Sequence, residues 1–280
     1  MFTYKEASCF LGRTLELKGK DIELAVTLDV GPRIISLRKP GGGSIMFEDT
    51  ADAVNKDCSS VYGEGKVWHI YGGHRIWLSP ESEATYYPDN EPVSYKITPD
   101  GCIFTPPAWE KAEVQPILQI RFMPEGGAEI AMGMTNLSDA ARELCIWSLT
   151  VLKPGGVLEA GLPTKDTGYL PNRNIVLWPY TDIKDERLEI RNDKLIVKSS
   201  TSATKPLKVG YHNPDIVTKY TFGGTVFVKA APGGEGAYPD FFCNVETYTS
   251  NLIHEVETLS PIVRVEAGKT LWHTERWELH

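Results

Sequence analysis

Short runs in which apolar and polar residues alternate recur along almost the whole chain, and this pattern constrains the fold more than any other feature. ILQIRFM (117–123), AEIAMGMTN (128–136) and RLEIRN (187–192) repeat with a period of two, which is typical of strands with one buried face. Glycine (25) and proline (19) punctuate the runs, as expected for turns between strands. We therefore expect an all-β, antiparallel, sandwich-like fold with few short helices.

The same reading gives the organisation of the chain. Few segments sustain a helical period. ESEATYY (81–87) and DAAREL (139–144) each suggest about one turn of helix. No Pro/Ser-rich linker, tandem repeat or low-complexity tract divides the sequence, so we expect one domain over residues 1–280. Other expected strands are SIMFED (44–49), ELCIWSLTVL (143–152), NIVLWPY (174–180), FFCNVETYT (241–249) and LIHEVETLS (252–260).

Charge and cysteine content exclude several classes of function. Lys and Arg total 29 against 37 Asp and Glu, a net charge of −8, without the basic patches that bind nucleic acid or anionic lipid. No apolar run approaches the ~20 residues of a membrane span, and no signal peptide is evident. The five cysteines are scattered and odd in number, which favours reduced thiols. We expect a cytoplasmic protein with a small, neutral partner.

The segment HIYGGHRIWLSPE (69–81) concentrates polar and aromatic residues. Flat alternation after the glycine pair places Arg75 and Trp77 on one face and His74 on the other. Glycines often mark bulges that re-aim a side chain, so His74 remains open as either a structural or a catalytic histidine. Arg75 and Trp77 fit a sugar site, because sugars present apolar faces rimmed with hydroxyls, but they also fit a surface cation–π pair.

Two other regions bear on a site. In LIHEVETLS, Glu255 and Glu257 share a face and His254 points away, and Glu255 is interpreted as a solvated strand residue. Trp272 and Trp277 are interpreted as core or edge cover. There is no phosphate-binding loop and no G-x-S-x-G motif, and His69 and His74 are five residues apart, unlike the zinc-peptidase spacing. No metal and no organic cofactor are expected.

Several segments together resemble the galactose mutarotase-like superfamily, which includes the aldose 1-epimerases. They are LELKGKDIELAVTLDVGPRIISLRKPGGGSIMFED (15–49), YGGHRIW (71–77), GAEIAMGMTNLSDAARELCIWSLTVL (127–152) and VETLSPIVRVEAGKTLWHTERWEL (256–279). The resemblance covers nearly the whole chain, but each of its motifs is only loosely defined. A bacterial mutarotase-like group of no settled function shares the GGHR-x-W and ETLSP features. The resemblance implies an antiparallel β-supersandwich whose concave face holds a monosaccharide.

The resemblance also implies roles for single residues. In mutarotases a glutamate near the C-terminus removes the proton from O1, and a histidine protonates the ring oxygen. The glutamate corresponds best to Glu257, with Glu246 as the rival. Where mutarotases place their histidine, this chain has Trp147, so His74 or His69 would have to replace it.

The function expected from the sequence is therefore an aldose 1-epimerase-like enzyme that interconverts the anomers of a free sugar. Glu257 would be the base and His74 the acid, with Arg75 and Trp77 as the substrate clamp and His69, Glu246 and Asp240 as further binding residues. The alternative is a carbohydrate-binding protein without catalysis, and a third hypothesis is a lyase or hydrolase using Asp240. The expected partner is a small sugar, bound by a monomer or weak homodimer.

Overall fold

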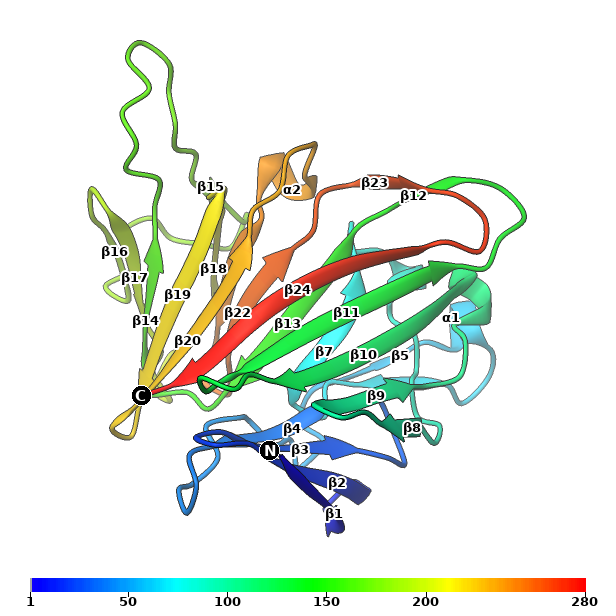
Figure 1. The fold of residues 1–280 in the computed structure, drawn as a ribbon. Coiled ribbons are helices and arrows are strands. Elements are labelled where there is room, and N and C mark those ends of the chain that lie inside the picture. Colours follow the sequence, from blue (N-terminus) through cyan, green and yellow to red (C-terminus); the bar gives the residue numbers. More distant parts are fainter. Residues whose placement is uncertain (1) are drawn as a thin grey trace.

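The structure is a computed structural model that describes residues 2–280, and strands account for 49% of it. Two large antiparallel sheets form most of the molecule (Figure 1). The first sheet has ten strands among the described residues, in the order β1 (Thr3–Cys9), β2 (Gly12–Lys18), β3 (Glu23–Thr27), β4 (Ile34–Arg38), β7 (Gly73–Leu78), β13 (Ile146–Leu152), β22 (His254–Leu259), β21 (Val245–Thr249), β18 (Leu207–Tyr211) and β15 (Val176–Leu177).

The second sheet also has ten strands within residues 2–280. Its order is β16 (Leu188–Ile190), β17 (Lys194–Lys198), β14 (Val157–Gly161), β19 (Asp215–Phe222), β20 (Thr225–Pro232), β24 (Thr270–Leu279), β11 (Ala128–Asn136), β10 (Val114–Phe122), β9 (Gly101–Thr105) and β8 (Ser94–Ile97). Two small ribbons pair β12 (Arg142–Leu144) with β23 (Val263–Val265), and β5 (Asn55–Asp57) with β6 (Val67–His69).

Helices are short throughout the part of the chain that the structure describes. They are α1 (Ser59–Tyr62) and α2 (Pro239–Phe242), with the 3-10 turns η1 (Glu83–Thr85) and η2 (Glu110–Ala112). No helix of residues 2–280 is long and apolar enough to cross a membrane. The expected all-β supersandwich with few short helices is confirmed, whereas the single-domain expectation stays a prediction.

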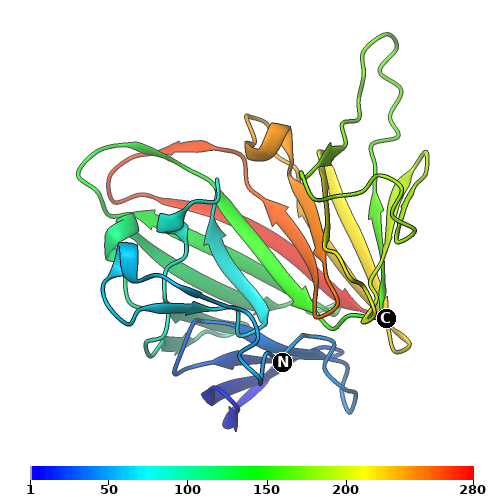
Figure 2. The same cartoon turned by 180° about the vertical axis from the view of Figure 1, so that it is seen from behind.

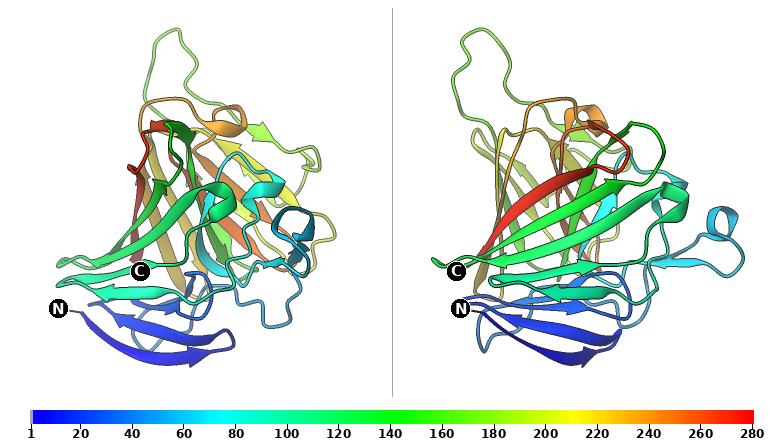
Figure 3. Two further views of the ribbon diagram at one scale, coloured as in Figure 1. Left: turned by 90° about the vertical axis from the view of Figure 1, so that its right-hand side faces the viewer. Right: turned by 45° about the vertical axis from the view of Figure 1, so that its right-hand side comes forward.

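The core lies between the two sheets. Alternation buries every second residue of β10 and β11, as the period of two predicts. Trp277 is fully buried in β24, while Trp272 on the same strand is 44% exposed. Seen from behind, β7, β13 and β22 of the first sheet come to the front (Figure 2), and the side views show the two layers (Figure 3).

Some expected elements differ from the structure. SIMFED forms only isolated bridges at Met46 and Glu48, and DAAREL contributes the strand β12 instead of a helical turn. ESEATYY does contain the single turn η1. The sequence analysis missed β19, although its burial alternates along most of its length. Val217 is on its exposed side and Thr218 on its buried side, so residue polarity does not follow the alternation in burial.

Candidate functional site

The site is built on one face of the first sheet, across strands β7, β13, β22 and β21. Arg75 pairs with Leu149, Leu149 with Glu257, and Glu257 with Glu246. Residues directly opposite each other in an antiparallel pair project to the same side, so these four side chains form a single row. Trp77 and Trp147 form the next row. The register therefore places Arg75, Trp77 and Glu257 on one face of the sheet, as predicted.

The glycine pair at the start of β7 allows the backbone to pass close to the backbone of neighbouring segments. Gly72 and Gly73 both have positive φ, 99° and 67°, a region that favours glycine. A Cβ on Gly73 would lie 2.3 Å from the carbonyl oxygen of Ile34. β7 can therefore pair directly with β4 at Ile34 and His74, and flat alternation holds from His74 onward.

A cavity of about 500 Å³ lies over this face. Its floor comes from the sheet and includes Trp77, Trp147, Leu149, Glu255, Tyr248 and Lys208. One wall is formed by Val54, Trp68, Ile70, Glu81 and Tyr86, and the other by Tyr180, Ala203–Pro206 and Ser250–Ile253. Arg75 and Glu257 share the face of the floor residues but are buried, with 1% and 0% exposure.

Glu257 is held by two donors. Trp147 Nε1 donates to Glu257 Oε2 at 2.9 Å, and Lys208 Nζ donates to the same oxygen at 3.2 Å. Glu257 Oε1 is buried and has no hydrogen-bond partner in residues 2–280. Lys208 Nζ also contacts Glu246 at 2.8 Å and lies 4.6 Å from the rings of Trp147 and Trp178. Glu257 therefore has one oxygen held by an indole N–H and an ammonium group, and one oxygen without a donor in the described residues.

The neighbouring carboxyl groups favour their protonated form. Burial raises the pKa of Glu255 to about 8, and the charge of Glu257 adds to the shift against the opposing Lys208. Burial likewise raises the pKa of Glu246 to about 8, although Lys208 opposes the shift. Carboxyl groups kept neutral in this way can donate a proton near neutral pH. Glu255 is partly buried and lines the cavity, which corrects its interpretation as a freely solvated strand residue.

Arg75 is buried without a hydrogen-bond partner. Its guanidinium lies 4.0 Å from the Trp77 ring and 4.9 Å from the Trp68 ring, and none of its three side-chain nitrogens finds an acceptor in the described residues. The other buried arginine, Arg33, donates to both oxygens of Asp89. Burial lowers the pKa of Arg75 to about 9. A buried cation without an acceptor is costly, so an acceptor from a ligand would relieve this cost if the covering rings moved aside.

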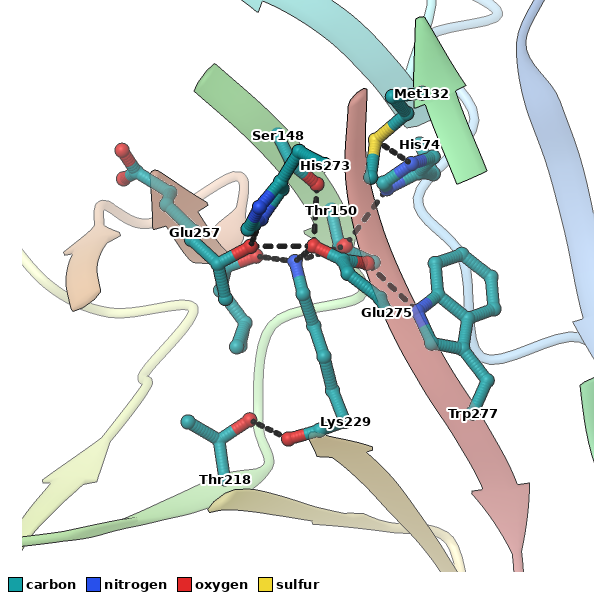
Figure 4. Close-up of polar contacts among 12 residues, drawn as sticks. His74, Met132, Ser148, Thr150, Thr218, Lys229, Glu257, His273, Glu275 and Trp277 are labelled. Atoms are coloured by element: carbon teal, nitrogen blue, oxygen red, sulfur yellow. Dashed lines mark hydrogen bonds and ion pairs between the residues drawn. The ribbon is translucent and has the colours of Figure 1, made fainter. Parts of the chain in front are cut away.

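His74 does not belong to the site, which corrects its expected role as the acid. It projects from the opposite face of β7, where Nδ1 contacts Thr150 Oγ1 at 3.0 Å and Nε2 contacts Met132 Sδ at 3.3 Å. Burial lowers its pKa to about 3, so it is neutral. Figure 4 shows His74 with the buried Lys229–Glu275 pair between the sheets, and the Glu257 side chain leading away from them. Flat alternation, not a bulge, decides its direction.

His69 and Asp240 also lie outside the cavity, against expectation. Trp68 and Ile70 line it, and the intervening His69 instead contacts Asp52 at 2.6 Å and stacks on a tyrosine ring. Asp240 lies in α2 with φ 51°, beside a separate hollow lined by Val176–Pro179 and Phe241. Among residues 2–280, no histidine lines the main cavity.

Sequence reasoning missed Lys208 and the cavity walls. A lysine within the otherwise apolar strand LKVGY was the signal for Lys208, because an unpaired lysine is rarely buried. Glu81 and Tyr86 lie in connecting segments, where alternation gives no direction, and Tyr180 lies beyond β15, which is shorter than the strand expected over 174–180. Their place in the cavity depends on loop conformation.

With its two large antiparallel sheets, the chain has the galactose mutarotase-like fold, as two solved structures show. A galactose mutarotase-like protein from Lactobacillus casei superposes with a TM-score of 0.57 at 10% identity, over 95% of this chain and 100% of that chain. An aldose epimerase homologue from C. elegans superposes with a TM-score of 0.51 at 10% identity, over 100% of this chain and 99% of that one. The resemblance expected from the sequence is confirmed at the level of the fold.

A larger protein shares the same fold. A TPR-domain containing protein from Parabacteroides distasonis superposes with a TM-score of 0.61 at 14% identity, over 95% of this chain. This chain covers only 47% of that protein, about half of its length. No protein-family model matches the sequence, and none of the curated proteins matches it. Identities this low show the fold alone.

Proposed function

We propose that the protein is an aldose 1-epimerase-like enzyme that binds a reducing sugar in the cavity over β7, β13, β22, β21 and β18 and interconverts its anomers. The observation that carries the proposal is the pair of glutamates on one face of β22. Glu257 is charge-stabilised by Lys208, and Glu255 has its pKa raised to about 8. A glutamate beside a cation and a second carboxyl group with a raised pKa suit an acid–base pair.

The proton transfers follow from these two environments. Glu257 Oε1 accepts the proton of the anomeric O1 hydroxyl while Glu255 donates its proton to the ring oxygen. The bond between C1 and the ring oxygen breaks and leaves an open-chain aldehyde. Rotation about the C1–C2 bond followed by closure, with both protons returning, gives the other anomer. Glu255 thus replaces the histidine donor expected from the family likeness.

The other groups bind the sugar. Trp77 and Trp147 stack with ring centroids 5.5 Å apart and offer an apolar surface to the C–H face of a pyranose. The unpartnered nitrogens of Arg75 are donors for sugar hydroxyls. Because Arg75 is packed under Trp68 and Trp77 and Glu257 is fully buried beside the cavity, a small shift of the side chains that cover them on binding is part of the proposal.

The test is anomer exchange, measured by NMR exchange spectroscopy on a panel of free aldoses. Glu257→Gln and Glu255→Gln keep the side-chain shape but remove the base or the acid, so each is expected to lower the catalysed rate by ~10²–10⁴-fold. Glu266→Gln is the matched control, because Glu266 is exposed and distant in the register from β22. Sugar binding, measured by calorimetry, is expected to survive in both active-site variants.

A second candidate, a carbohydrate-binding protein without catalysis, is favoured by one observation: the described cavity has no histidine lining it. It predicts sugar binding by wild-type protein with an exchange rate equal to that in buffer. That result would refute the enzyme proposal and leave the binding site intact. Wild-type protein that neither binds nor exchanges any aldose would refute both.

A further inference from the structure

The floor of the cavity extends across five neighbouring strands, which is wide for one sugar ring. Trp77, Trp147, Glu255, Tyr248 and Lys208 each lie on a different strand, in the order β7, β13, β22, β21 and β18. Adjacent strands lie ~4.8 Å apart, so this floor spans ~19 Å from the first strand to the fifth. One ring seated over two or three strands leaves the remaining floor uncovered.

The volume of the cavity leads to the same conclusion. One hexose displaces about as much volume as six water molecules, or ~180 Å³ at ~30 Å³ per water. The cavity measures about 500 Å³, which is room for two such rings. Beyond the segment Ala203–Pro206 lies a second hollow of about 410 Å³, and Tyr180 lines both.

The aromatic side chains of the cavity form two separate groups. Trp68, Trp77, Tyr86 and Trp147 are in mutual contact at the β7 side, with ring centroids 4.9–5.5 Å apart along the chain of neighbours. Tyr180 and Tyr248 form the other group, with centroids 6.4 Å apart. Glu257 lies in the row between the groups, because Trp77 and Trp147 form the next row on one side and Glu255 and Tyr248 pair in the next row on the other. An aromatic platform on each side of the reactive carboxyl group provides a seat for one ring on each side.

We infer that the ligand is a reducing oligosaccharide of at least two units. Its reducing unit lies over Trp77 and Trp147, within reach of Glu255 and Glu257, and the next unit lies against Tyr180 and Tyr248. The inference rests on the proposed function for the identity of the reducing end. The second subsite itself rests on the width, volume and aromatic content of the cavity.

The experiment compares matched probes with the same reducing unit. Glucose is compared with maltose, cellobiose and lactose, and xylose and mannose with their β-1,4-linked disaccharides, by NMR anomer exchange. At least one disaccharide is expected to have a kcat/KM about tenfold above that of its monosaccharide, equivalent to ~1.4 kcal/mol. Equal values for every pair, or exclusion of all the disaccharides, would overturn the inference.

Tyr180→Ala tests the subsite directly. Tyr180 is 45% exposed, so its removal leaves the core unchanged, and we expect the disaccharide-to-monosaccharide ratio of kcat/KM to fall to about one. Tyr169→Ala is the control, because Tyr169 is fully exposed and does not line the cavity. An unchanged ratio in Tyr180→Ala would contradict the assignment.

Calorimetry with methyl glycosides separates this inference from the proposed function, because methyl glycosides bind but cannot exchange anomers. If no sugar is exchanged but methyl maltoside or methyl cellobioside binds about tenfold more tightly than methyl glucoside, the two-unit site stands and the enzyme proposal falls. If monosaccharides are exchanged and no disaccharide binds better, the enzyme proposal stands and the two-unit site falls. Absence of any binding would overturn both.

Discussion

Breaking the buried ion pair behind the site is expected to destabilise the protein strongly. Lys229 Nζ lies 2.9 Å from Glu275 Oε1, and both side chains are fully buried between the sheets (Figure 4). Lys229 also donates to Thr150 Oγ1 at 3.0 Å and to the carbonyl of Val256 at 2.9 Å. Lys229→Met removes the cation and leaves the Glu275 carboxylate buried without its partner.

Two arguments give the magnitude. Removing one partner of a buried pair typically costs ~3–5 kcal/mol. Burial alone would raise the pKa of Glu275, but the charge of Lys229 and the nearby histidines lower it from 4.5 to about 2. That shift corresponds to ~3 kcal/mol. Because the folded pKa lies below the unfolded one, this contribution is complete above about pH 4.5 and is lost as the pH falls through about 2.

The pair as a whole contributes less than these figures suggest, because burial lowers the pKa of Lys229 and so disfavours its charge. We therefore expect the double variant Lys229→Met/Glu275→Gln to cost less than either single variant.

The free energy of unfolding is measured by urea titration at pH 7. Lys219→Met, an exposed lysine on β19, is the control and should change it by less than ~0.5 kcal/mol. Single variants that cost under ~1 kcal/mol, or a double variant equal to their sum, would refute the reasoning.

Three further predictions concern the site. Glu255 must be protonated to act as the acid, so the rate of catalysed exchange, after subtraction of the buffer rate, should fall as the pH rises through about 8. The Glu255→Gln variant should not show this fall, and a flat pH profile for the wild type would contradict the role of Glu255 as the acid. Trp147→Phe keeps a stacked aromatic ring but removes the hydrogen-bond donor to Glu257. We expect kcat to fall ~10–100-fold, because a hydrogen bond to a charged group contributes ~1.5–3 kcal/mol. An unchanged kcat would show that this hydrogen bond does not orient the base. Gly73→Ala should destabilise the fold by ~2–4 kcal/mol, because the added Cβ is strained at positive φ and also clashes with the backbone. The control Gly41→Ala has a similar φ, but its Cβ would meet no atom of the described residues, so it should cost only ~1 kcal/mol. Equal losses of stability for the two variants in thermal unfolding would exclude the clash.

Alternation within strands could be predicted from the sequence because it depends only on the period of two. It placed Arg75 and Trp77 on one face, and Glu255 with Glu257, as the register shows. The assignment of His74 to the site required a bulge at the glycine pair. The glycines are needed for a different reason, close approach to the backbones of neighbouring segments, and they leave the alternation after them undisturbed.

What the sequence could not show is the environment of each carboxyl group. Glu255 appeared solvated because one strand reveals its alternation but not what covers the exposed face. In the structure, two distant parts of the chain, Trp68 with Tyr86 and Ala203–Pro206, form walls around it together with the adjacent turn Ser250–Ile253. The burial that raises its pKa therefore comes from tertiary contacts. The same strand pattern with shorter loops would leave Glu255 open to solvent, so the proposed chemistry depends on the loops as much as on the sheet.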